Sequence, residues 1–253
     1  VAGVKLTHRS ASMVILDFAG HEVADFTTIL PHYTAPTSVV VSAIASAVRA
    51  GADQASVGID ALGLGIQGVV DATRGFVYWS PSLDERNTPL GAMLAEALSL
   101  PVFVDNDANL VAMAEKHFGY GRGVSDFIVA TIENGVGMGI VLGDEVYRGT
   151  RGCGAEFGHT KVELDGALCR CGQRGCLEAY VADYALLREA VVATGLTGNG
   201  DANQLDALFA AAKNGDAIAQ SIFLRAGRIF AMGLANIVNI FDPQLIILSG
   251  ERM

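Results

Sequence analysis

The sequence predicts an α/β protein of two lobes. A chain of 253 residues, 51% of them hydrophobic, can bury a large core. Strand patterns alternate along it with helix patterns, and a hairpin followed by a helix is indicated in each half. We place an N-terminal lobe over residues 1–105 and a C-terminal lobe over 106–253, and we expect the second lobe to be truncated at its end.

The N-terminal lobe is predicted to contain two strands, a helix and a third strand. Residues 14–23 read as two apolar runs around a turn with glycine, which is typical of a hairpin. A helix is predicted over 39–49, with Thr37 or Ser38 as its N-cap. Residues 55–65 read as a strand that ends in a glycine-rich stretch, where the backbone bends or closely approaches another group.

The boundary between the lobes is predicted to be a strand followed by a helix. Residues 101–104 form a short buried strand that leads into Asp105, Asn106 and Asp107. The helix that follows has an apolar face carrying three residues, Leu110, Met113 and Ala114.

The C-terminal lobe is predicted to begin with a second hairpin, formed by residues 127–132 and 137–142. A long helix stops at Asp242 and Pro243, because proline cannot continue a helix, and a strand follows over 244–249. The apolar residues of this helix recur at helical spacing: Ile218, Ile222, Ala226, Ile229, Gly233 and Ile237.

Charge and hydropathy exclude several classes of function. The net charge is −10 and the 17 Lys and Arg residues are scattered, so this chain offers no basic surface for DNA or for an anionic membrane. No N-terminal signal segment and no uninterrupted run of about 18 apolar residues occur. We therefore expect a cytoplasmic protein with no membrane partner, whose thiols stay reduced.

Three cysteines within eight residues predict a structural zinc site. Cys169, Cys171 and Cys176 supply three thiolates and His159, ten positions upstream of the first cysteine, supplies an imidazole, which completes a tetrahedral shell. The alternative is a disulfide with a spare thiol, but a bridge across one residue would be strained. The fourth cysteine, Cys153, is interpreted as an ordinary small residue.

The zinc loop would also order two carboxylates and an imidazole. Glu156 and His159 lie just before the loop, and Glu178 follows its last thiol by two residues, so the segment could present them to a polar ligand. Each has a simpler explanation. Glu178 could be a first-turn glutamate of a helix that starts near Leu177, and Glu156 could be solvated.

Three motifs together resemble the ROK family of bacterial sugar-responsive repressors and sugar kinases: VDNDAN at 104–109, GAEFGH at 154–159 and CRCGQRGCLE at 169–178. The resemblance implies the actin-like ATPase fold, of the ribonuclease H type, with two α/β lobes and a sugar in the cleft between them. Carried over by position, it also implies six ligands of a sugar or amino sugar: Gly68, Asn106, Asp107, Glu156, His159 and Glu178.

In the kinases of this family, the aspartate that corresponds to Asp107 is the base that takes the proton of the attacking sugar hydroxyl. Its presence does not establish catalysis, because the same carboxylate also binds sugar when no phosphoryl transfer occurs. An aspartate or asparagine before a helix is, moreover, a common N-cap.

The phosphate loops depart from the kinase pattern. The kinases open with Asp-X-Gly-Gly-Thr, whereas this chain has Lys5 at the aspartate position and bulky residues in place of both glycines. The second loop, Gly-Thr-Gly in the kinases, begins here with Glu133, a like charge toward polyphosphate. The resemblance therefore favours the sugar-sensing effector region of a ROK transcriptional regulator, with structural zinc and no ATP.

We expect this regulator to bind DNA only through a winged helix-turn-helix that is absent from this chain, and to form a homo-oligomer, a dimer or tetramer. Two alternatives stay open. One is an ATP-dependent sugar kinase of the glucokinase or amino-sugar kinase type, and the other is a zinc-stapled interaction module without a ligand.

Overall fold

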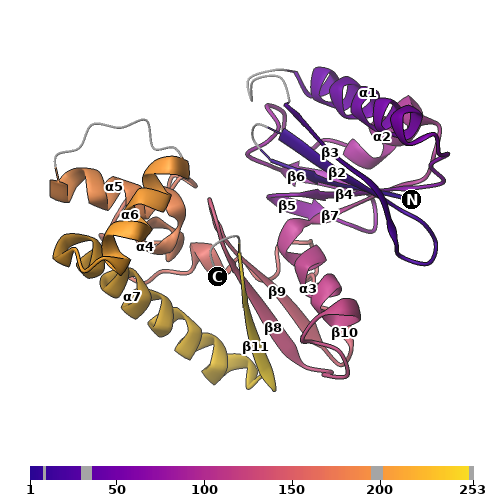
Figure 1. Cartoon of the computed structure of the whole chain (residues 1–253). Helices are drawn as coiled ribbons and strands as arrows, with labels where there is room; N and C mark the ends of the chain where they lie inside the picture. The colour runs from indigo at the N-terminus through magenta and orange to yellow at the C-terminus, as the bar shows by residue number, and fades with distance from the viewer. Residues whose placement is uncertain (8–9, 30–35, 195–201, 251–253) are drawn as a thin grey trace. The chain divides into compact units, whose positions relative to one another are not determined.

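The computed structural model of the chain describes residues 1–7, 10–29, 36–194 and 202–250 (Figure 1). It is an α/β protein of two compact units. Unit 1 comprises Val1–Val111 and Arg148–Gly154, and unit 2 comprises Ala112–Tyr147 and Ala155–Met253. The units thus divide within helix α3 (Asp107–Phe118), where we had expected a boundary at 105/106, and a short later segment returns to unit 1.

Unit 1 is built on a five-stranded sheet in the order β3-β2-β1-β4-β7. The pairs β3–β2 and β2–β1 are antiparallel, and β1–β4 and β4–β7 are parallel. A two-stranded sheet pairs β5 with β6. The strands are β1 (Ala2–Leu6), β2 (Ser10–Leu16), β3 (Glu22–Ile29), β4 (Leu62–Ile66), β5 (Val69–Asp71), β6 (Phe76–Trp79) and β7 (Val102–Asn106).

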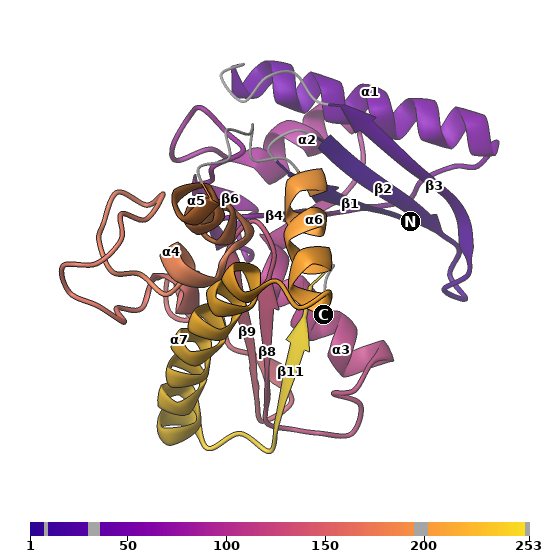
Figure 2. The ribbon, with the colours of Figure 1, turned by 60° about the vertical axis from the view of Figure 1, so that its left-hand side comes forward.

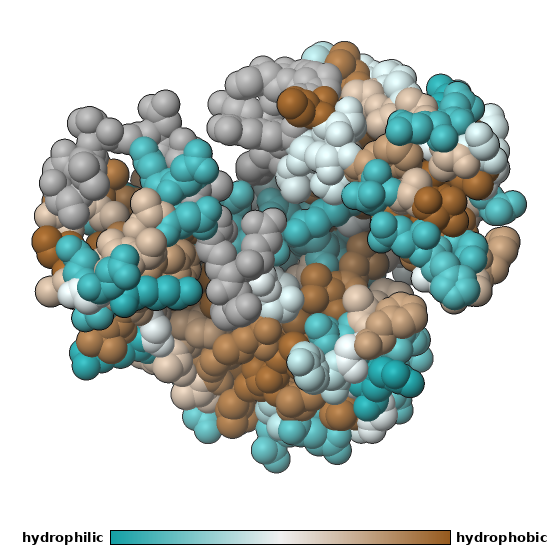
Figure 3. Space-filling model, in the orientation of Figure 1, coloured by the Kyte–Doolittle hydropathy of each residue, from teal (hydrophilic) through white to brown (hydrophobic). Residues whose placement is uncertain are grey.

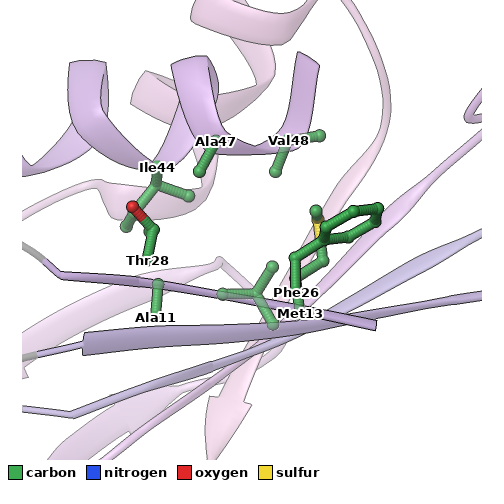
Figure 4. Close-up of a pocket in the computed structure, with 8 residues that line it drawn as sticks. Ala11, Met13, Phe26, Thr28, Ile44, Ala47 and Val48 are labelled. Atoms are coloured by element: carbon green, nitrogen blue, oxygen red, sulfur yellow. The ribbon is translucent and has the colours of Figure 1, made fainter. Parts of the chain in front are cut away.

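The core of unit 1 lies between its sheet and the helices α1 (Thr37–Ala55) and α2 (Leu90–Leu98). Alternate residues of the strands point into it, and Leu62, Leu64 and Ile66 of β4 are fully buried. A cavity of about 10 Å³ lies between α1 and the sheet, as Figure 4 shows, lined by side chains that include Met13, Phe26 and Ile44. It is apolar and at most the size of one water molecule, so it is no sugar site.

Unit 2 repeats the strand arrangement of unit 1. Its sheet has the order β10-β9-β8-β11, with β9 antiparallel to both neighbours and β11 parallel to β8. The elements are β8 (Phe127–Ile132), β9 (Val136–Leu142), β10 (Glu145–Val146), η1 (Phe157–His159), α4 (Glu178–Val181), α5 (Asp183–Thr194), α6 (Ala202–Lys213), α7 (Ala217–Phe241) and β11 (Leu245–Ser249). The second predicted hairpin and the last strand are confirmed.

Helix α7 packs beside α4, α5 and α6 (Figure 2). The carboxylate of Asp216 caps it by accepting a hydrogen bond from the Ala219 N–H at 2.8 Å, and Asp242 ends it in a left-handed conformation before Pro243. The helix is long and apolar enough to cross a membrane, which is weak evidence, because a core helix meets the same criterion. Its buried residues form one helical stripe, as a core helix requires: Ala219, Ile222, Ala226, Phe230, Gly233 and Ile237.

The outer side of α7 and the neighbouring strand carry exposed apolar residues. Figure 3 shows hydrophobic surface, in brown, over the C-terminal half of α7 and over β11. The exposed side chains there include Met232, Val238, Ile240 and Leu248.

Two sequence predictions in unit 1 were wrong. Neither Thr37 nor Ser38 caps α1: Pro36 occupies the N-cap, and the Thr37 hydroxyl donates instead to Asp84. The strand predicted over 55–65 begins only at Leu62, because α1 continues to Ala55. The sequence contains no typical signal for the end of α1, because the C-cap in the left-handed conformation is a serine, Ser56, where glycine is usual.

The apolar face of α3 was predicted only in part: Leu110 and Met113 are half-buried, as expected of that face. Ala108 and Ala112 are buried, whereas Ala114 is exposed. Small residues on this face let the helix approach its neighbours closely, a preference that periodicity of large apolar residues does not reveal.

Candidate metal centre and ligand-binding residues

His159, Cys169, Cys171 and Cys176 converge in unit 2 with all their ligand atoms within 4.8 Å of one another. The Cys169 Sγ lies 3.7 Å from Nδ1 of His159, and the sulfur atoms of Cys171 and Cys176 are also 3.7 Å apart. The four predicted metal ligands are therefore brought together, although the last lies 17 positions after the first.

These separations fit a tetrahedral zinc ion. With Zn–S bonds of about 2.3 Å and Zn–N bonds of about 2.0 Å, tetrahedral geometry requires S–S edges of about 3.8 Å and S–N edges of about 3.6 Å. All four cysteines of the chain are free, so the disulfide alternative is not found. The residues present therefore fit a Cys₃His metal site, with a chemistry that zinc prefers.

The loop that carries the cysteines is shaped by glycine and backbone hydrogen bonds. The Cys169 N–H donates to the Gln173 carbonyl, and the Gly172 N–H donates back to the Cys169 carbonyl. Gly175 has a φ of +74°, and a Cβ there would lie 1.5 Å from the Glu163 carbonyl oxygen, so no other residue fits. The conformation of the loop thus depends on a close backbone contact at Gly175.

The thiols differ in burial and in their charged neighbours. Cys169 and Cys176 are buried, and Cys171 is exposed. Burial raises the pKa of the Cys169 thiol to about 12 without a metal, so a metal ion must displace its proton. The Lys161 ammonium lies 2.9 Å from Cys176 Sγ, a hydrogen bond that raises the pKa of Lys161 and keeps this side chain charged.

His159 presents its two ring nitrogens to different partners. Nδ1 faces Cys169, whereas Nε2 lies 4.0 Å from Oε2 of Glu156. The side chains of His159 and Glu156 are 30% and 41% exposed, so both reach solvent. The geometry allows Nδ1 to bind a metal ion while the opposite edge of the ring contacts a polar ligand.

Glu178 is buried at the start of α4, so it is a first-turn glutamate but not a solvated one. Its Oε2 accepts a hydrogen bond from the Val136 N–H at 3.3 Å, and its Oε1 accepts one from the Tyr184 hydroxyl at 3.3 Å. Oε1 also lies 3.6 Å from the sulfur of Cys169. Glu178 thereby links the cysteine loop to the first residue of β9.

In unit 1, Gly68 and Asn106 contact each other. The Asn106 amide donates to the Gly68 carbonyl at 2.9 Å, and a Cβ on Gly68, whose φ is +118°, would lie 2.2 Å from the Trp79 carbonyl oxygen. The Asn106 Oδ1 accepts hydrogen bonds from the N–H groups of Ala108 and Asn109. Asn106 therefore caps α3, and Asp107, the first residue of the helix, also accepts a hydrogen bond from the Ala108 N–H at 3.0 Å.

Sequence reasoning missed the pair formed by Asp105 and Arg148. Asp105 is buried at the end of β7, and its Oδ2 accepts hydrogen bonds from Nε and Nη2 of Arg148 at 2.9 and 2.7 Å. Its Oδ1 accepts from the Asn106 N–H and from the Asn109 amide. The signal in the sequence that could have indicated this pair is an acidic residue, Asp105, at the end of an apolar strand. The pair fixes the backbone that carries Asn106 and Asp107.

The six predicted sugar ligands divide between the units. Gly68, Asn106 and Asp107 belong to unit 1, and Glu156, His159 and Glu178 belong to unit 2. Within each unit, two or more of them are in contact or share a neighbour, as described above.

The two turns predicted to replace phosphate loops differ in construction. At the β1–β2 turn, the Thr7 hydroxyl oxygen accepts from the Ser10 N–H and lies 2.9 Å from the Ser10 hydroxyl. Lys5 lies exposed on β1, opposite Ser12 on β2. At the β8–β9 turn, the Glu133 N–H donates to the Gly135 carbonyl.

The fold and the cluster define a two-unit α/β protein with a Cys₃His site. Residues 3–253 match the sequence model of the ROK family, and the chain belongs to this family. Its fold is accordingly the actin-like ATPase fold. A ROK family glucokinase from Streptomyces griseus, solved with glucose and AMPPNP, is 34% identical with a TM-score of 0.84, over 99% of this chain and 82% of that one.

Relatives of both functional kinds are similar in sequence. A glucokinase of Streptomyces coelicolor is 35% identical over 88% of this chain and 74% of its own length. A xylose repressor of Caldicellulosiruptor bescii is 33% identical over 79% of this chain and 52% of its own length. This chain therefore spans about half of the repressor and three quarters of the kinase.

Proposed function

We propose that this chain is the sugar-sensing effector region of a ROK transcriptional regulator, which binds a sugar or amino sugar without phosphorylating it. The proposed sugar ligands are Gly68, Asn106 and Asp107 of unit 1 and Glu156, His159 and Glu178 of unit 2. Vicinal sugar hydroxyls can each donate to a carboxylate and accept from an amide or imidazole, which these residues supply.

The observation that carries the proposal is the replacement of the phosphate-binding groups. Lys5 stands where a kinase of the family has the aspartate that serves magnesium, and an ammonium cannot ligate a cation. The β1–β2 turn is closed by the side chains of Thr7 and Ser10. Glu133, at the second turn, adds negative charge where polyphosphate would have to approach. Phosphoryl transfer depends on holding ATP and magnesium in line with the sugar, so the dominant contribution to catalysis would be missing.

A sugar kinase is the second candidate. It is favoured by the glucokinase relatives, which match at slightly higher identity and over more of their length than the xylose repressors do. It is also favoured by Asp107, which stands at the position of the kinase base and is not the helix cap. If the chain is a kinase, Asp107 is its base.

The metal of the Cys₃His site is proposed to be zinc in a structural role. Four protein ligands close the coordination shell and leave no position for a reacting group. Zinc would fix the segment that carries His159 and Glu178, so removal of zinc should weaken sugar binding even though zinc itself touches no sugar. One zinc per chain, measured by elemental analysis of a reduced and chelator-free sample, is the expected result.

The remaining expectations concern partners. The acidic chain would act on DNA only through a winged helix-turn-helix outside this sequence, with sugar binding shifting the equilibrium between two arrangements of the regulator. A cytoplasmic location and a homo-oligomer, a dimer or tetramer, are also proposed. The exposed apolar residues of α7 and β11 are consistent with an interface, and light scattering coupled to gel filtration would measure its size.

The test separates sensor from kinase. A thermal-shift panel of sugars and amino sugars identifies the ligand, because a specific ligand stabilises by mass action. Asp107→Asn should weaken that ligand at least about tenfold through loss of a charged acceptor, whereas Asp53→Asn, on the exposed surface of α1, should not. The full-length product should show no ATP-dependent sugar phosphorylation. Turnover near 1 s⁻¹ or above, typical of working enzymes, would establish the kinase instead.

A further inference from the structure

We infer that Lys161 supports the metal centre without being a ligand of the metal. Its ammonium donates a hydrogen bond to the Cys176 sulfur, which strengthens zinc binding and protects the thiolate from alkylation. The inference rests on the proposed zinc site and assigns a role to a residue outside the four ligands.

The backbone places Lys161 beside Cys176. The two residues face each other in an isolated antiparallel bridge, although 15 positions separate them. The bridge is held on both sides, by a hydrogen bond from the Val162 N–H to the Gly175 carbonyl and by another from the Leu177 N–H to the Thr160 carbonyl. The backbone of Lys161 is therefore held beside Cys176, and Nζ of the lysine lies 2.9 Å from Sγ of the cysteine.

The charge of the site explains why a cation is useful there. Three thiolates, a neutral imidazole and Zn²⁺ leave a net charge of −1 on a centre in which two of the thiols are buried. Glu178 adds a carboxylate whose Oε1 is 3.6 Å from the Cys169 sulfur. The Lys161 ammonium offsets this negative charge, and a charge-assisted hydrogen bond is stronger than a neutral one.

The arginines of the same segment have other partners. Arg170 donates to the Asn134 carbonyl and stacks on the Tyr184 ring, Arg174 donates to the Gly166 carbonyl, and Arg188 donates to the Leu168 and Ala179 carbonyls. Their contacts hold the backbone of the loop and the helices after it. Lys161 instead contacts a ligand atom, which distinguishes it from these arginines.

The role has two chemical consequences. A hydrogen bond to a thiolate withdraws electron density from sulfur and lowers its nucleophilicity, so zinc-bound Cys176 should react slowly with alkylating reagents. The same bond stabilises the deprotonated, metal-bound form and so opposes loss of zinc.

The experiment compares Lys161→Met, Lys161→Arg and the wild type, with Lys213→Met, an exposed lysine of α6, as the matched control. Zinc affinity is measured by competition with a chromophoric chelator. Lys161→Met should bind zinc about 10- to 100-fold more weakly, the usual effect of losing a partner of a metal ligand. Lys161→Arg keeps the charge and a donor and should stay close to wild type, as should Lys213→Met.

Two further measurements exclude a purely structural effect. The zinc-loaded Lys161→Met variant should be alkylated by iodoacetamide faster than the loaded wild type, and the melting temperatures of the two metal-free proteins should agree. Equal zinc affinity and equal alkylation in the two proteins would overturn the inference. A lower melting temperature of metal-free Lys161→Met than of the metal-free wild type would also overturn it, because the lysine would then stabilise the loop without the metal. A wild type that binds no zinc would overturn the proposed centre together with this inference.

Discussion

The β1–β2 turn of unit 1 and the β8–β9 turn of unit 2 occupy corresponding places in two sheets that share an arrangement of four strands, but different hydrogen bonds hold them. In unit 1, the turn is closed by the side chains of its own Thr7 and Ser10. In unit 2, residues far along the chain hold the turn: Glu178 accepts from the Val136 N–H, the Asp183 N–H donates to the Glu133 carbonyl, and Arg170 donates to the Asn134 carbonyl.

The difference shows that turns at corresponding places in similar sheets can depend on different parts of the chain. The hydrogen bonds described between Thr7 and Ser10 join residues three positions apart, both in unit 1. The second turn is held by the segment that contains the metal ligands, because Arg170 lies between two of them and Glu178 follows the last by two residues. The conformation of the β8–β9 turn should therefore depend on the metal, and that of the β1–β2 turn should not.

The strongest way to break this comparison is to remove the metal. Cys171→Ser removes one thiolate, and we expect zinc content to fall from about one per chain to near zero, since a closed site needs all four ligands. Hydrogen exchange should then accelerate at Val136 and in the loop over 169–176, while the strands β1 and β2 keep wild-type protection. Equal acceleration in the two units would contradict the separation drawn here.

The reciprocal change concerns unit 1. Arg148→Met leaves the buried Asp105 carboxylate without its charged partner, and we expect the free energy of unfolding to fall by about 3 kcal/mol, toward the lower end for a broken buried pair because Arg148 is partly exposed. Hydrogen exchange should rise at Asn106 and Asn109, while zinc content stays unchanged. Denaturant unfolding provides the free energy. Arg151→Met, at an exposed arginine of the same segment, is the control.

A smaller effect is expected when the link between the metal loop and the turn is cut. Glu178→Ala leaves the Val136 N–H and the Tyr184 hydroxyl without this acceptor, which should cost about 1–3 kcal/mol. Zinc content should remain near one per chain, so this variant separates the link from the metal itself. Glu145→Ala, at an exposed glutamate of β10, should leave stability unchanged. Normal protection of the Val136 amide in Glu178→Ala would show that the carboxylate does not hold the turn.

The smallest effect should come from the local turn. Thr7→Ala removes the hydroxyl that accepts from the Ser10 N–H, and the loss should be about 1 kcal/mol because water can replace a partly exposed hydrogen bond. The expected change in exchange is confined to the β1–β2 hairpin. If Thr7→Ala instead destabilised the protein as much as Glu178→Ala, the two turns would not differ in the way that the contacts indicate.

Features that depend on local spacing could be predicted from the order of the residues alone. The four metal ligands could be predicted because three lie within eight residues and their chemistry is specific. The two hairpins and the end of α7 before Pro243 could be predicted because alternation and backbone restrictions act over a few residues. The motifs also placed the chain in its family.

Features that join distant residues became visible only in the folded chain. The pairing of Asp105 with Arg148 spans 43 positions, the contact of Glu178 with Val136 spans 42, and that of Lys161 with Cys176 spans 15. The identity of the α3 cap, the late start of the strand predicted over 55–65 and the burial of Ala112 depend in the same way on what packs nearby. A residue's partners across the fold are set by the joint packing of several elements, and no local pattern of residues records that packing.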